Sequence, residues 1–122
     1  MDICKELHGT RVLICGEDGP MLAGERDVGD FLGAAWAEDA SLVAIPTARI
    51  GADFFRLRTR VAGEIVQKFV NYRIRLAIIG DISAPSAESQ ALRDFVHEAN
   101  QGEAFWFLDD LAALERRLAA RS

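Results

Sequence analysis

The sequence predicts an α/β protein in which helices alternate with the strands of a mostly parallel sheet. Two observations carry this prediction. The apolar runs within residues 41–46 and 73–81 are continuous rather than alternating, which is typical of strands buried on both faces. Segments with a helical apolar period lie between such runs, and this alternation is typical of a sheet with crossover helices. The expected order is β-β-α-β-α-β-α-β-α, with four helices in one domain spanning residues 1–122.

The first half of the chain begins with a predicted hairpin. Its strands are residues 2–6 and 11–15, with His8 and Gly9 in the turn. GEDGP at residues 16–20 then breaks the chain. An amphipathic helix follows, whose inward face we expect to contain Val28, Phe31, Leu32, Ala35 and Trp36.

The second half begins with SLVAIP, residues 41–46, which predicts a buried strand ended by proline. Asp53 is the expected N-cap of the second helix, because apolar residues recur every four positions after it, at Leu57, Val61, Ile65 and Phe69.

RIRLAIIGD, residues 73–81, is the strongest predicted strand, and the residues after it, ISAPSAES, are expected to form a loop. A third helix follows and stops at Gly102, with an inward side made of Leu92, Phe95, Val96 and Ala99. AFWFL at 104–108 predicts the last strand. The final helix has acids first and arginines last, as the helix dipole favours.

The charge of the protein is acidic overall but unevenly distributed. A formal charge of −5 over 122 residues argues against nucleic acid or a membrane surface as the partner, because both require many cations. Six basic and two acidic residues lie between positions 53 and 75, so this stretch carries +4 and the remainder −9. The molecule is therefore expected to be polarised.

The cysteines and the missing motifs exclude several classes of site. Cys4 and Cys15 are the only cysteines, without a CxxC pair or a Cys/His cluster, so no metal site is expected. No P-loop or G-x-G-x-x-G pattern occurs, so no cofactor is expected. No signal peptide or membrane-spanning run is present, and we expect a cytoplasmic protein with reduced thiols.

The candidate binding residues are Arg56, Arg58, Thr59 and Arg60, at the expected start of the second helix. Guanidinium groups near the free N–H groups of a helix start favour a phosphate, a carboxylate or an acidic loop of a partner. The alternative is that these arginines only solvate the surface and pair with acids of the same chain. Thr59 is also a candidate phosphoacceptor, although a threonine in this position more often caps a turn.

A weaker candidate site lies where the parallel strands end. Ligands of open parallel sheets bind beyond the carboxyl ends of the strands, so Asp81 is a candidate catalytic residue there, with Glu64 and Arg60 as its expected neighbours. The structural alternative is that Gly80 and Asp81 form an ordinary turn.

The element order, together with LVAIP, TARIGADFFRLR and TRVAGEIV, resembles the STAS domain of bacterial anti-sigma factor antagonists. In that family a serine opens the second helix and can be phosphorylated by a partner kinase. Thr59 falls on this serine. Leu57, Arg58 and Arg60 depart from the family's motif, and only Gly63 remains nearby.

Two longer segments carry a closer resemblance. FFRLRTRVAGEIVQKFVNYRIRLAIIGDIS and LRDFVHEANQG are similar to a bacterial domain-of-unknown-function family, family 4180, of about this length. This resemblance implies no activity.

Three functions are compatible with the sequence. The first is a STAS-like regulatory module that contacts a protein partner, or a second copy of itself, through the arginine-rich helix entrance. The second is a domain that binds a small anionic ligand, such as a phosphorylated metabolite or a nucleotide, at the carboxyl ends of the strands. The third, an enzyme using Asp81 and Glu64, ranks last because no catalytic motif supports it.

Overall fold

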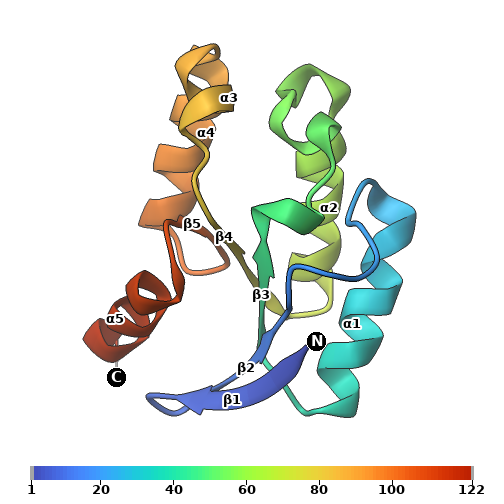
Figure 1. The fold of residues 1–122 in the computed structure, drawn as a ribbon, viewed down its shortest axis with the longest axis vertical. Helices are drawn as coiled ribbons and strands as arrows, with labels where there is room; N and C mark the ends of the chain where they lie inside the picture. The colour runs from blue at the N-terminus through green and yellow to red at the C-terminus, as the bar shows by residue number, and fades with distance from the viewer. Residues whose placement is uncertain (1, 122) are drawn as a thin grey trace.

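The computed structural model describes residues 2–121 and places five strands in one sheet, in the order β1-β2-β3-β4-β5 (Figure 1). β1 (Ile3–Leu7) and β2 (Thr10–Ile14) form an antiparallel hairpin. β3 (Leu42–Pro46), β4 (Arg75–Ile79) and β5 (Phe105–Leu108) then join in parallel, one after another. The predicted α/β class with a mostly parallel sheet is therefore confirmed.

The helices are divided unequally between the two faces of the sheet (Figure 1). α1 (Val28–Ala37), α2 (Val61–Asn71) and α4 (Gln90–Gln101) cover one face. α5 (Leu111–Arg121) packs on the other. In doubly wound folds, the ligand crevice forms where successive crossovers change from one face of the sheet to the other. The strands of this sheet follow chain order, so it has no such position.

The expected number of four helices is wrong, because residues 2–121 contain five α-helices. The additional one is α3 (Ser83–Ala87), where a loop was expected. Asp81 Oδ1 accepts a hydrogen bond from the Ser83 backbone N–H at 2.8 Å, and Pro85 lies in the first turn, where its missing N–H breaks no helical hydrogen bond. This local support is sufficient for a single short helix.

The larger hydrophobic core lies under α1, α2 and α4. Phe54 is at its centre, with ring centroids 6.2 Å from Phe105 and 6.3 Å from Phe107, both in edge contacts. The predicted inward residues of α4 that are partly buried (Phe95, Val96 and Ala99) pack against this core, and Gly102 ends the helix as expected.

The smaller core lies between the sheet and α5. Leu114 and Leu118 are buried against strand residues that include Trp106. The Trp106 indole N–H donates to the Gly102 carbonyl at 2.8 Å, and the Arg117 guanidinium stacks 4.6 Å from the Trp106 ring centroid. The polar end of a buried tryptophan is thereby satisfied.

Two expectations about individual helices are wrong. α2 begins at Val61 rather than near Asp53, because the chain first forms two short 3-10 turns, η3 (Ala52–Phe55) and η4 (Leu57–Thr59). The burial of Phe54 in the core holds this segment out of helical register.

Trp36 was expected to face the core, but it is 50% exposed. Its ring lies edge-on to Tyr72 with centroids 5.4 Å apart, at the carboxyl ends of α1 and α2. The residues of α1 that are buried, Val28, Phe31, Leu32 and Ala35, form an arc too narrow to include it.

Candidate functional sites

The arginine-rich segment is the connection that leads into α2, not the first turn of that helix. Arg56 has an extended backbone between η3 and η4, and Arg60 has a left-handed backbone (φ 67°) immediately before α2. The two residues therefore do not share a helical face, as a helix starting at Asp53 would have required. A positive φ is uncommon for a residue with a Cβ and marks a sharp change of chain direction.

Thr59 holds this connection together. Its hydroxyl oxygen lies 2.8 Å from the Asp53 carbonyl and 2.7 Å from the Arg56 carbonyl, and it accepts a longer contact, 3.3 Å, from the Val61 backbone N–H. The hydroxyl proton is therefore used by carbonyl groups of the preceding turns. Thr59 is exposed to solvent, as a phosphoacceptor must be, but its O–H is already a structural donor.

Arg56 and Arg58 line one wall of a groove with a volume of about 380 Å³. The opposite wall comes from the end of α3 and the start of α4, including Glu88 and Ser89. Thr59 and Arg60 are not among its lining residues. The structure thus brings two of the four predicted binding residues to one concave surface.

The arginines differ in how strongly they are paired. Arg56 lies 3.6 Å from the carboxylate of Asp53, and both side chains are largely exposed, so this ion pair is weak. Within residues 2–121, the side chains of Arg58 and Arg60 form no hydrogen bond or ion pair. Among the described residues, Arg58 is therefore the groove arginine whose charge is unpaired.

The predicted group of Asp81 and Glu64 does not meet in one cavity. Glu64 lies on α2 and lines a depression with Glu25, Lys68 and Tyr72. Asp81 follows β4 and lines a different pocket. Hydrogen bonds from Ser83, first of all from its backbone N–H, hold the pKa of the Asp81 carboxyl below its ordinary value. A carboxylate of lowered pKa is a poor general base at neutral pH.

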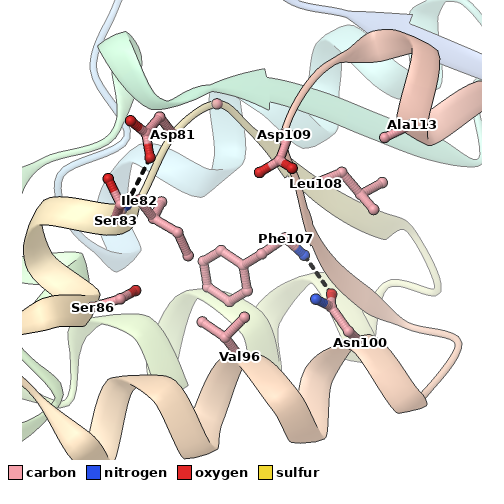
Figure 2. Close-up of a pocket in the computed structure, with 11 residues that line it drawn as sticks. Asp81, Ile82, Ser83, Ser86, Val96, Asn100, Phe107, Leu108, Asp109 and Ala113 are labelled. Carbon is pink, nitrogen blue, oxygen red and sulfur yellow. Dashed lines mark hydrogen bonds between the residues drawn. The ribbon is translucent and has the colours of Figure 1, made fainter.

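The pocket at the carboxyl ends of β4 and β5 has a volume of about 430 Å³ (Figure 2). Ile82, Val96 and Phe107 form its apolar part, and the carboxylates of Asp81 and Asp109 lie along one side. The side-chain oxygen of Asn100 accepts the Phe107 backbone N–H at 2.8 Å, which fixes the orientation of this amide at the pocket wall. Two nearby carboxylates disfavour an anion in this pocket.

A buried arginine that the sequence did not single out organises the loops after β2 and β3. Arg49 is 3% exposed, and its guanidinium lies 2.9 Å from Asp2 Oδ1. It also donates to the Pro20 and Gly16 carbonyls, at 2.9 Å and 3.3 Å, and lies 5.1 Å from the Phe31 ring centroid. These contacts satisfy the charge inside the protein, so Arg49 has a structural role.

Cys15, beside this cluster, is not a reactive thiol. Burial raises its pKa from 9.0 to about 12, and the carboxylate of Asp2 adds to the shift. The thiolate, which is the nucleophilic form, is therefore scarce at neutral pH.

Fold and sites together define a small α/β protein with α1, α2 and α4 on one face of the sheet and α5 on the other. A family model described as Domain of unknown function (DUF4180) matches residues 7–118. The chain therefore belongs to this family. No curated protein and no solved structure matches it. Among residues 2–121, no helix is both long enough and apolar enough to cross a membrane.

Proposed function

We propose that this protein is a protein-interaction module that binds an acidic segment of a partner in the groove lined by Arg56 and Arg58. The observation that carries the proposal is the unpaired guanidinium of Arg58 on a concave surface. A carboxylate of a partner would give Arg58 the charge-assisted hydrogen bonds that it lacks in the isolated chain.

Selectivity would arise from the opposite wall of the groove. Glu88 lies there and repels a segment that is acidic along its whole length. A partner segment with carboxylates on one side and uncharged residues on the other would pair with the arginines of one wall and avoid repulsion by Glu88 on the other. The partly buried Leu57 and Pro85 offer apolar contacts within the same groove. A bacterial, cytoplasmic, STAS-like regulator that acts by such contacts remains the cellular role we favour.

The test compares two charge reversals with identical effects on net charge. The Arg58→Glu variant reverses the unpaired arginine of the groove, whereas Arg116→Glu reverses an exposed arginine on α5. A fluorescent peptide of alternating glutamate and leucine should bind the native protein and Arg116→Glu alike, and Arg58→Glu at least tenfold more weakly. Rising salt should weaken this binding. Equal loss in both variants, or in neither, would overturn the groove assignment.

A second candidate function is small-molecule binding in the pocket of Figure 2. Its volume of about 430 Å³ and its apolar part, formed by Ile82, Val96 and Phe107, support this candidate. The carboxylates of Asp81 and Asp109 favour a neutral or cationic ligand over the phosphorylated metabolite expected from the sequence. A thermal-shift series with nucleotides, sugars and diamines tests it, because a ligand of the native state must raise the melting temperature. No shift with any of them would remove this candidate.

A further inference from the structure

The sheet face that carries α5 is too large for one helix. α5 has 11 residues, so it is about 16 Å long and about 10 Å wide with its side chains. Strands of five residues are about 17 Å long, and five neighbouring strands span about 19 Å. Part of this face must therefore lie beyond the reach of α5.

The covered part is the half near the start of the parallel strands. Leu114 and Leu118 of α5 pack there with Val12, Leu42 and Ala77, all fully buried. Between these two leucines, Glu115 lies 3.8 Å from His8 in the hairpin turn, so α5 also contacts that end of the sheet. The half at the carboxyl ends of the parallel strands is left with less cover.

The side chains of this second half form an apolar strip. Strand register places five of them on one face: Ile3 pairs with Ile14, Ile14 with Ala44, two residues before Pro46, and Ile79 with both Pro46 and Leu108. Ile3 is 51% exposed, Leu111 at the start of α5 is 42% exposed, and the others are partly exposed. The apolar strip consists of Ile3, Ile14, Pro46, Ile79, Leu108 and Leu111.

Acidic residues follow the strands along one edge of the apolar strip. Glu17 and Asp18 come after β2, Asp81 after β4, and Asp109 after β5, and all four are exposed. The cation of the loop after β3, Arg49, is buried and paired with Asp2. A partner on the apolar strip therefore meets negative charge at this edge.

We propose that the apolar strip binds an amphipathic α-helix of a partner protein, with apolar residues against the sheet and lysine or arginine along the acidic edge. The uncovered width is about that of one helix, and a helix there would lie beside α5 at the usual 8–10 Å between packed helices, as a rough guide. A second copy of this chain is the weaker occupant, because pairing two strips would bring two acidic edges together.

This site is independent of the arginine groove. η3, η4 and α4 belong to the other face of the sheet, where Phe55, Leu57 and Phe95 pack against the larger core. The two proposals can therefore fail separately, and Arg58→Glu should leave helix binding unchanged.

The test uses a synthetic helical peptide of about four turns, with leucines at i, i+3, i+4 and i+7 and lysines along one edge. The first control peptide has the same composition in scrambled order. The second keeps the order but has glutamate in place of lysine. Fluorescence anisotropy gives the affinity, and methyl NMR spectra of the isoleucines locate the contact. We expect the lysine peptide to bind best and to shift the methyl signals of Ile3, Ile14 and Ile79.

Three variants sharpen the assignment. Ile3→Glu and Leu111→Glu alter exposed side chains, so the fold should persist, which circular dichroism checks; each should weaken binding at least tenfold. Val70→Glu alters a side chain that is 43% exposed on α2 and should change nothing.

Other outcomes would overturn the proposal. Binding of the scrambled peptide with equal affinity would show nonspecific adhesion, and a preference for the glutamate peptide would contradict the charge of the partner. Self-association in sedimentation experiments that Ile3→Glu abolishes would assign the apolar strip to a second copy instead. Absence of any peptide binding by the folded protein would also refute it.

Discussion

Gly19 faces the guanidinium of Arg49 so closely that a Cβ at position 19 would lie 2.8 Å from Arg49 Cζ. Gly19 also has a φ of 141°, a conformation that residues with a side chain rarely adopt. The GEDGP turn is thus shaped around a buried cation. Because Arg49 is tied to Asp2 and to the Gly16 and Pro20 carbonyls, it has little freedom to move away.

Gly19→Ala should therefore destabilise the protein by about 2 kcal/mol, through steric contact and backbone strain together. Gly33→Ala is the matched control, because Gly33 is exposed on α1 and no atom lies near its missing Cβ. That change should stabilise by about 0.5–1 kcal/mol. Urea unfolding measures both, and equal effects would refute the close packing of Arg49 on Gly19.

Loss of the Arg49 charge should be more harmful than loss of the Asp2 charge. Arg49→Met leaves Asp2 without its cation and leaves the Gly16 and Pro20 carbonyls without their donor, so we expect a loss of about 3 kcal/mol in unfolding free energy. The Asp2 side chain is 34% exposed, and water can partly replace its contacts. Asp2→Asn removes the charge that compensates the buried Arg49 but keeps an acceptor oxygen for it, so we expect a smaller loss, about 2 kcal/mol. A larger loss for Asp2→Asn would contradict this order.

The raised pKa of Cys15 predicts a loss of stability in alkali. Between an unfolded value near 9.0 and the folded value of about 12, the unfolded thiol releases its proton while the folded thiol retains it. Stability should therefore fall as pH rises above 9, by up to about 1.4 kcal/mol per pH unit from this group. The difference in urea midpoint between the native protein and Cys15→Ala, measured at pH 8 and pH 10, isolates this contribution. A difference that does not change with pH would contradict it.

Thr59→Val should destabilise the connection before α2 by about 1 kcal/mol, because the Asp53 and Arg56 carbonyls lose their hydroxyl donor. Thr59→Ser keeps the donor and should be close to neutral. Hydrogen exchange at the Val61 amide, which contacts Thr59 Oγ1, reports the local loosening.

Phosphorylation of Thr59 would remove the same donor, so we expect it to open this connection rather than to lock it. Intact-mass measurement of protein from cells tests whether the modification occurs. Faster exchange around Thr59 in the modified protein tests its effect, and slower exchange would contradict the expected opening.

Much of the fold was predictable from the sequence. A strand that is buried on both faces needs a continuous run of apolar side chains. LVAIP and RLAII contain such runs, and they form β3 and β4. The hairpin turn at His8 and Gly9 was equally clear, and both residues have the positive φ that such a turn needs. Local propensity and periodicity determine these elements, because their signals lie within a few residues of each other.

The sites were less predictable, because they depend on contacts between distant segments. The period of four through Leu57 and Val61 favoured one long helix, but the burial of Phe54 against β5 delayed the helix start to Val61. Glu64 was expected to lie beside Asp81 at the carboxyl ends of the strands, yet the two residues line different pockets. Nothing near Arg49 in the sequence indicates that Asp2, 47 residues away, pairs with it.

The sequence by itself determined the α/β class, the order of the strands along the chain and the concentration of positive charge before α2. Tertiary structure alone decided which arginines share a groove, that Arg49 is buried, and that one sheet face has a single helix for cover. The physical reason is range: hydrophobic period and turn chemistry act between neighbours in sequence, whereas charge pairing and surface coverage depend on how whole elements pack.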